Sequence, residues 1–131
     1  MNTENKPLKI LLVDDDRFLL DMYLLKFKKS GCEVDVSPNS ANGLEKLRGG
    51  DAFDIIIVDI IMPGMDGLEF LTKVRDEKLA GDSVFVMLTN QTDSVDKAKS
   101  LGVDGYIIKA STIPSEVVEQ VLQIYKSAHQ K

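Results

Sequence analysis

Apolar and polar residues alternate in blocks along the chain, and the blocks predict strands and helices in turn. Five apolar runs are too short for helices, and runs of this length between polar residues are typical of strands. They cover residues 8–13, 33–36, 55–58, 84–88 and 106–108. The stretches that follow them carry apolar residues at helical spacing, which predicts helices. These cover residues 17–29, 39–48, 67–79, 94–101 and 114–128.

Strands and helices in strict alternation predict a doubly wound α/β fold, a five-stranded parallel sheet with helices on both faces. The run 55–58 is β-branched throughout and suits a central strand that is buried on both faces. The segment 33–36 alternates polar and apolar residues, so we expect it at an edge of the sheet. We expect residues 1–7 to be a disordered leader and residues 8–131 to form one domain.

The bulk composition narrows the range of functions. The chain has 131 residues, a usual length for one domain, and a formal net charge of -5. Such an acidic domain is a poor candidate for binding nucleic acid directly, because phosphate contacts need a basic face. The single cysteine, Cys32, is expected to be a small buried hydrophobe in a reducing compartment. Because no apolar run is long enough to span a bilayer, we expect a cytoplasmic protein with no membrane partner.

Polar side chains stand at the ends of the strands that are expected to be central. Asp14 and Asp15 follow the first strand, and Asp59 follows the third. Thr89 follows the fourth strand and Lys109 the fifth. The carboxyl ends of the strands in an open α/β sheet border the crevice where ligands bind. We therefore expect these carboxylates, the hydroxyl and the ammonium group to meet at one edge of the sheet.

Such a group of charges favours a bound cation. Two carboxylates ~4 Å apart repel each other by roughly 4 kcal/mol at an effective dielectric constant of about 20. Several carboxylates together therefore need a counter-ion or must take up protons. Oxygen ligands without histidine or cysteine indicate Mg²⁺, and Mg²⁺ beside a lysine is a usual setting for phosphoryl transfer.

Each of these residues also has a purely structural interpretation. The segment 14–16 could cap the following helix, because aspartate is a good N-cap and is favoured at the positive end of a helix. Thr89 alone would be a turn residue, and Lys109 alone a solvated surface charge. Asp59 is different, because it ends a run of β-branched residues, where burial without a partner is costly. Taken together and in strand order, the four features favour a functional site.

Four segments surround the polar residues at the strand ends: ILLVDDD at residues 10–16, DIIIVDIIMPGMDG at 54–67, VFVMLTN at 84–90 and GYIIK at 105–109. These segments resemble the receiver domains of response regulators, the chemotaxis-Y-like family of two-component signalling. They stand in the same order as in the family, and the resemblance spans essentially the whole chain. It implies a flavodoxin-like sheet with strand order 2-1-3-4-5, an order that the residue pattern alone does not give.

The resemblance implies how the site would work. Asp59 would be the nucleophile that takes a phosphoryl group from a sensor histidine kinase, a phosphotransfer protein or a small phosphodonor. Asp15, Asp59 and the backbone carbonyl of Ile61 would bind Mg²⁺, and Asp14 would act mainly through water or hydrogen bonds. Such a domain is a switch, and it would catalyse only its own phosphorylation and dephosphorylation.

Further matching residues would respond to the phosphoryl group. Lys109 would pair with the phosphoryl oxygens, Thr89 would swing towards them, and Tyr106 would repack inward behind Thr89. This would change the surface formed by the fourth helix, the fifth strand and the fifth helix, where a downstream protein partner would read the state. Ile61 and Gln91 match positions that tune hydrolysis of the phosphoryl group in the family.

One departure from the family concerns the end of the fifth strand. The family usually has Lys-Pro there, commonly with a cis peptide, whereas this chain has Lys109-Ala110. A cis bond before alanine costs ~3–4 kcal/mol, so we predict a trans peptide. The chain should then leave the usual path, with Ser111 or Thr112 helping to cap the final helix. Lys109 should still reach the acidic edge, because its side chain is long and flexible.

Other functions fit the residues less well. An aspartyl phosphatase resembling haloacid dehalogenases would carry a second aspartate where this chain has Ile61. A flavodoxin-like flavin module would need a hydroxyl- and glycine-rich loop after the first strand, where this chain has three aspartates that would repel the FMN phosphate. A phosphorylation-independent, receiver-like docking module is the remaining alternative. We recognise no effector domain, so we expect a stand-alone receiver or the receiver of a longer regulator.

Overall fold

The computed structural model describes residues 6–129 and contains one five-stranded parallel sheet. The strands are β1 Lys9–Val13, β2 Glu33–Ser37, β3 Ile55–Val58, β4 Val84–Thr89 and β5 Gly105–Ile108. They lie in the order β2-β1-β3-β4-β5, which confirms the predicted doubly wound α/β fold. The expected leader falls mainly on residues 1–5, outside the described residues, so that expectation stays a prediction.

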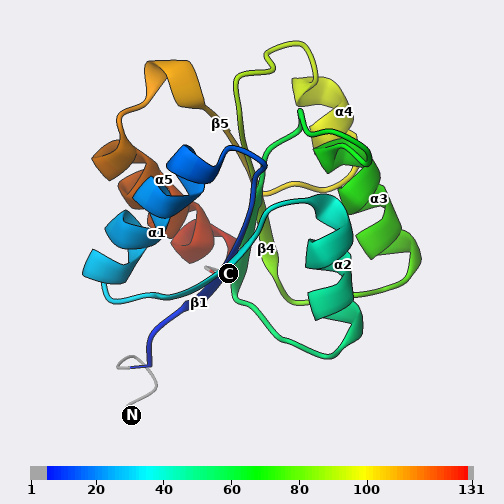
Figure 1. Ribbon diagram of the computed structural model, residues 1–131, viewed down its shortest axis with the longest axis horizontal. Helices are drawn as coiled ribbons and strands as arrows, with labels where there is room; N and C mark the ends of the chain where they lie inside the picture. Colours follow the sequence, from blue (N-terminus) through cyan, green and yellow to red (C-terminus); the bar gives the residue numbers. More distant parts are fainter. Residues whose placement is uncertain (1–5, 130–131) are drawn as a thin grey trace.

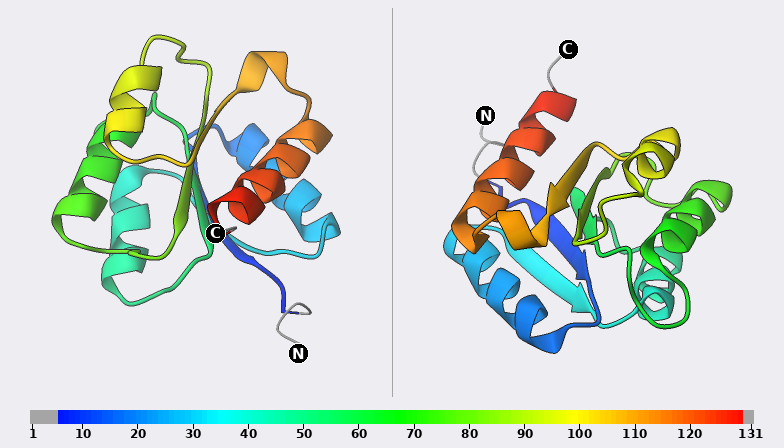
Figure 2. Two further views of the ribbon diagram at one scale, coloured as in Figure 1. Left: turned by 180° about the vertical axis from the view of Figure 1, so that it is seen from behind. Right: turned by 90° about the horizontal axis from the view of Figure 1, so that it is seen from above.

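Helices cover both faces of the sheet. They are α1 Arg17–Lys29, α2 Ser40–Arg48, α3 Gly67–Asp76, α4 Val95–Ser100 and α5 Pro114–Ala128, and a short 3₁₀ helix, η2 Lys109–Ser111, precedes α5. α1 and α5 lie on one face and α2, α3 and α4 on the other (Figure 1), as the view from above also shows (Figure 2). No helix within residues 6–129 is long and apolar enough to cross a membrane.

The observed elements differ from the predicted ones mainly at their ends. α3 ends at Asp76 and not at residue 79, because Lys78 leaves the helix through left-handed backbone with a φ of 57°. β4 extends to Thr89, which pairs with Ile108 of β5. The end of β4 is set by its pairing with β5, a strand that comes later in the sequence, so the local pattern of apolar residues does not predict it.

The core consists of two apolar layers, one on each face of the sheet. Alternate residues of β1 divide between them: Ile10 and Leu12 pack with α1 and α5, and Leu11 and Val13 pack with α2 and α3. Every residue of β3 is at most 2% exposed, as predicted for a central strand. β2 is only partly buried and lies at an edge of the sheet, also as predicted. Cys32 is buried beside the first layer as a free thiol.

The register of the sheet brings the carboxyl ends of the strands together. Val13 of β1 is paired with Val58 of β3, and Val58 with Met87 of β4. β4 and β5 end on the pair Thr89 and Ile108. The residues that follow these pairs therefore emerge at one edge of the sheet, at the top of Figure 1.

Candidate functional site

Three carboxylates meet at the carboxyl edge of the sheet. One oxygen each of Asp14, Asp15 and Asp59 lies within 4.8 Å of the other two. Asp14 and Asp59 are buried, at 6% and 8% exposure, whereas Asp15 is exposed. The structure thus brings together the acidic residues that the sequence places after the first and third strands.

Lys109 reaches this cluster from the turn after β5. Its Nζ donates to Asp14 Oδ2 at 2.7 Å and to Asp59 Oδ2 at 2.9 Å, and its side chain is 9% exposed. Burial by itself lowers the pKa of Lys109, but the hydrogen bonds and charges of the two carboxylates outweigh it and raise the pKa above its ordinary value. The ammonium group is therefore charged at neutral pH, and the prediction that it reaches the acidic edge is confirmed.

Asp14 does not receive a full compensating charge. Burial raises the pKa of its carboxyl group, and the hydrogen bonds from Lys109 and from the Asp16 amide offset this only in part. The Asp16 N–H donates to Asp14 Oδ1 at 2.9 Å. One ammonium group is shared by two buried carboxylates, and the exposed Asp15 adds a third negative charge. The cluster therefore carries an excess of negative charge that a cation would relieve.

The start of α1 separates the roles of the neighbouring aspartates. Asp16 Oδ1 accepts the Leu19 N–H at 3.1 Å, which makes Asp16 the N-cap of the helix. The structural interpretation of this segment thus holds for Asp16, whereas Asp14 and Asp15 belong to the carboxylate cluster.

The loop after β3 is packed closely beneath Asp59. The Ile61 N–H donates to Asp59 Oδ1 at 3.3 Å. The Gly67 N–H donates to the Ile60 carbonyl oxygen at 2.8 Å, and a Cβ on Gly67 would lie only 2.3 Å from the Asp59 carbonyl oxygen. Only glycine permits this approach. The prediction that a helix begins at Gly67 is confirmed. The close approach to the Asp59 carbonyl oxygen was not predicted, because no local signal gives such a tertiary contact.

Thr89 and Tyr106 both contact the loop that follows β4. Thr89 is fully buried, and its Oγ1 accepts the Gln91 N–H at 3.2 Å. The Tyr106 hydroxyl donates to the Gln91 carbonyl oxygen, and burial, with the charges of Asp93 and Asp59, raises the pKa of Tyr106. The movement of the two side chains on phosphorylation stays a prediction.

The turn after β5 confirms one prediction and corrects another. The Lys109-Ala110 peptide is trans, as predicted, since the described residues contain no cis peptide. Neither Ser111 nor Thr112 caps α5, so that prediction was wrong. The chain coils into η2 first, and the Ser111 hydroxyl donates back to the end of β5 at 3.4 Å. The N-cap position falls on Ile113, whose backbone is extended.

The cluster borders an open cavity of ≈530 Å³. The residues that line it are Asp15, Asp16, Leu19, Asp59, Ile61, Thr89, Asn90, Gln91 and Lys109. The donor set of the cluster consists of carboxylate oxygens, with neither histidine nor cysteine among them, so it fits a hard cation such as Mg²⁺ better than zinc or copper. Asp14, Asp15 and Asp59 are the side chains that could hold it.

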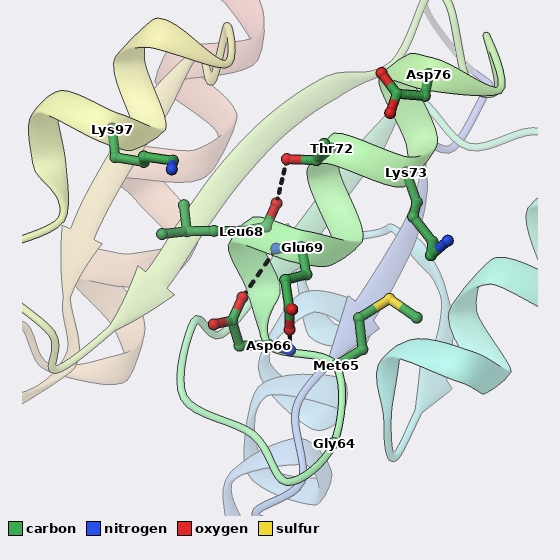
Figure 3. A pocket seen from close by; sticks show the side chains of 9 residues that line it. All are labelled: Gly64, Met65, Asp66, Leu68, Glu69, Thr72, Lys73, Asp76 and Lys97. Carbon is green, nitrogen blue, oxygen red and sulfur yellow. Dashed lines mark hydrogen bonds between the residues drawn. The ribbon is translucent and has the colours of Figure 1, made fainter.

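A larger cavity, of ≈670 Å³, lies elsewhere, between α3 and α4. Figure 3 shows the residues that line it: Gly64, Met65, Asp66, Leu68, Glu69, Thr72, Lys73, Asp76 and Lys97. The Asp66 N–H donates to Glu69 Oε1 at 2.9 Å and the Glu69 N–H donates to Asp66 Oδ1 at 2.8 Å, which makes a capping box. The Thr72 hydroxyl donates to the Leu68 carbonyl oxygen at 2.9 Å. Asp66, Glu69 and Thr72 are thus engaged in hydrogen bonds that stabilise α3. Although this cavity is larger, the buried carboxylates and the lysine lie at the carboxyl edge of the sheet.

Comparison with known proteins agrees with the site. The family model for the response regulator receiver domain matches residues 10–121. The nitrate/nitrite response regulator protein NarL of Escherichia coli (strain K12) is 34% identical over 109 residues, which are 82% of this chain and 50% of that protein. The two-component response regulator ORR42 of Oryza sativa subsp. japonica is 32% identical over 132 residues, covering 98% of this chain and 95% of that protein.

Solved structures show the same fold. Chemotaxis protein CheY4 of Vibrio cholerae matches with a TM-score of 0.81 and 28% identity, over 91% of this chain and 99% of that one. TrrA of Thermotoga maritima, solved in complex with Mg²⁺-BeF, matches with a TM-score of 0.76 and 30% identity, over 88% and 97%. Our chain spans about half the length of most of the curated relatives, 50% of NarL for example. By sequence and by fold, this chain belongs to the response regulator receiver domains of two-component signalling.

Proposed function

We propose that this receiver domain is a Mg²⁺-dependent phosphorylation switch in which Asp59 accepts the phosphoryl group. The observation that carries the proposal is the place of Asp59. It is buried at the end of the central strand, 2.9 Å from the Lys109 ammonium group, and it lines a cavity. Two further carboxylates lie beside it. This combination suits a nucleophile whose product carries additional negative charge.

The transfer is a displacement at phosphorus. One Asp59 carboxylate oxygen forms a bond to phosphorus while the P–N bond of a phosphohistidine breaks, and the imidazole leaves with the bonding electrons. With acetyl phosphate the P–O bond breaks and acetate leaves. The switch is reset by hydrolysis: water attacks phosphorus, Asp59 leaves as a carboxylate, and inorganic phosphate is released. The domain catalyses only these two reactions on itself.

Lys109 and the acidic residues divide the electrostatic task. Lys109 would pair with the phosphoryl oxygens, and its bond to Asp14 would keep it at the edge once Asp59 is modified. Asp15, Asp59 and the Ile61 carbonyl oxygen would hold Mg²⁺, with Asp14 acting through water or hydrogen bonds. A bound Mg²⁺ supplies positive charge that offsets the phosphoryl oxygens.

Thr89 and Tyr106 would report the phosphoryl group to a downstream protein. Thr89 lines the same cavity as Asp59, and Tyr106 bonds to the loop after β4 through Gln91. A movement of Thr89 towards the phosphoryl group would break its contact with the Gln91 N–H. The loop would then repack and change the α4-β5-α5 surface that the partner reads.

Exposed apolar side chains support a protein as the phosphodonor, either a sensor histidine kinase or a phosphotransfer protein. Within residues 6–129, the exposed large apolar side chains are Phe18 at 74%, Leu25 at 62%, Ile113 at 60% and Ile61 at 58%. Phe18 lies in the first turn of α1, Ile61 lines the cavity, and Ile113 precedes α5. Three of the four thus lie near the carboxyl edge, where a donor protein would dock.

Intact-mass spectrometry tests the proposal. After incubation with acetyl phosphate and Mg²⁺, we expect one added phosphoryl group that hydroxylamine removes, and almost none when Mg²⁺ is chelated. Wild-type protein that stays unlabelled under these conditions would refute the proposal.

A further inference from the structure

We propose that Asn90 is a positioning residue that ties the loop carrying Thr89 to the turn carrying Lys109. Asn90 Oδ1 accepts the Ala110 N–H at 2.7 Å. Thr89 and Lys109 are the residues immediately before the two ends of this bond. The inference rests on the proposed function, because it concerns how two residues of that reaction are held relative to each other.

The bond continues the connection between β4 and β5 beyond the end of the sheet. The backbone pairing of these strands ends at Thr89 and Ile108. Lys109 then begins η2, so its backbone no longer continues the strand. The Asn90 side chain supplies the next link, because its carbonyl oxygen accepts an amide hydrogen from η2.

The bond also depends on the residue at position 110. Proline has no N–H, so the Lys-Pro sequence that is usual in the family could not donate to Asn90. Proline would also disfavour helical backbone at the residue before it, and Lys109 is the first residue of η2. Asn90 and Ala110 therefore form a matched pair: alanine provides the donor, and asparagine provides the acceptor.

A second bond holds the same loop. The Tyr106 hydroxyl donates to the Gln91 carbonyl oxygen, so β5 and its turn bond to the loop at two successive residues. Asn90 and Ala110 are both exposed, which means that little apolar packing holds this corner. The direction of the turn thus depends on hydrogen bonds, and Lys109 needs that direction to reach Asp59 at 2.9 Å.

Loss of the bond should move Lys109 but not the carboxylates, which directly follow β1 and β3. We expect Asn90→Ala to slow the phosphorylation of Asp59 by about three- to tenfold, the range for one lost hydrogen bond. The Mg²⁺ concentration that gives the half-maximal rate should stay unchanged. A slower labelling rate with an unchanged Mg²⁺ requirement distinguishes a positioning role from a general loss of stability.

Ser83→Ala is the matched control. The Ser83 hydroxyl donates to the Phe53 carbonyl oxygen at 2.7 Å and so joins two loops at the opposite edge of the same sheet. This variant should lose stability while its labelling rate and its Ala110 amide exchange stay at the wild-type values.

Two measurements on the full chain decide the inference: hydrogen exchange of the Ala110 amide by NMR without phosphodonor, and the rate of labelling by acetyl phosphate. Asn90→Ala should exchange faster and label more slowly, and Asn90→Asp, which keeps an oxygen acceptor, should recover the exchange protection. Unchanged exchange in Asn90→Ala would overturn the inference. Faster exchange with an unchanged labelling rate would overturn the positioning role alone, whereas an unlabelled wild type would overturn the proposed function and this inference with it.

Discussion

The two edges of the sheet use acidic residues in opposite ways. At the amino edge, Asp54 Oδ2 accepts the Lys9 N–H at 2.8 Å, and Asp104 Oδ2 accepts the Phe85 N–H at 2.9 Å. Each of these carboxylates satisfies one backbone amide near the start of a strand. They stabilise the fold, and neither belongs to the carboxylate cluster at the opposite edge.

At the carboxyl edge the carboxylates gather instead. Asp14, Asp15 and Asp59 lie within 4.8 Å of one another, and two of them share Lys109. Their mutual repulsion works against folding as long as no counter-ion offsets it. The comparison shows that the acidic residues at the amino edge bond to backbone amides, whereas those at the carboxyl edge form a crowded cluster of like charges. Such clusters of groups with perturbed pKa values are common at functional sites, which supports the proposed phosphorylation site.

The sharpest test of this division substitutes the two aspartates that flank β3. Asp59→Asn should abolish labelling by acetyl phosphate, because the amide oxygen is a poor nucleophile. Asp54→Asn makes the same change at the other end of the strand and should label at the wild-type rate, since its oxygen still accepts the Lys9 N–H. Intact-mass spectrometry measures both. Undiminished labelling of Asp59→Asn would contradict the assignment.

The next effect concerns the two aspartates at the start of α1. Asp15→Asn should raise the Mg²⁺ concentration needed for half-maximal labelling by about tenfold or more, because a carboxylate ligand is lost. Asp16→Asn should change it little, because asparagine is as good an N-cap as aspartate. A Mg²⁺ titration of the labelling rate compares them. Equal behaviour of the two variants would mean that Asp15 is not a ligand.

A smaller effect, of opposite sign at the two edges, is expected in stability. Without Mg²⁺, Asp14→Asn should raise the free energy of unfolding by about 1 kcal/mol, because it removes one of the crowded charges and keeps an oxygen for Lys109. Asp104→Ala should lower it by about 1 kcal/mol, because the Phe85 N–H loses its acceptor. Urea unfolding in EDTA measures both free energies. An Asp14→Asn variant that is less stable than the wild type would contradict the inference that the cluster carries excess negative charge.

The gain from Asp14→Asn should depend on pH. The pKa of Asp14 is raised in the folded protein, mainly by burial, so the folded state binds its proton more tightly than the unfolded state does. The wild type therefore loses stability as the pH rises through the raised pKa of Asp14. The amide in the Asp14→Asn variant does not titrate, so the difference between the variant and the wild type should be largest above the raised pKa of Asp14, and it should vanish below about pH 4, where the carboxyl group is protonated in both states. A difference that persists at acidic pH would have another cause.

The sequence predicted the strand order only through the family resemblance, but it predicted the layers and the acidic edge from the residues themselves. β3 could be recognised because burial on both faces requires an unbroken apolar run. The convergence of Asp14, Asp59 and Lys109 followed from parallel strands, whose carboxyl ends meet at one edge.

Other features depend on tertiary contacts that leave no local signal. The close approach of Gly67 to the Asp59 carbonyl oxygen involves residues that only the fold brings together. The prediction that Ser111 or Thr112 helps to cap α5 was wrong, because η2 coils the chain before α5 begins. No role was predicted for Asn90, because the Ala110 N–H that donates to its side chain lies far away in the sequence, in the turn after β5.

The smallest predicted effect concerns the lifetime of the phosphoryl group at the carboxyl edge. Ile61 lines the cavity and is 58% exposed, so its branched side chain can shield phosphorus from water. Ile61→Asn would replace this apolar side chain with an amide that can bond to an attacking water. We therefore expect the half-life of the phosphorylated state to fall by about two- to fivefold. Leu25→Asn is the control, because Leu25 is similarly exposed, at 62%, but lies on α1 outside the lining of the cavity. Loss of the added mass over time, after removal of the phosphodonor, gives both half-lives. A half-life that is unchanged or longer in Ile61→Asn, or equally shortened in Leu25→Asn, would show that Ile61 does not shield the phosphoryl group.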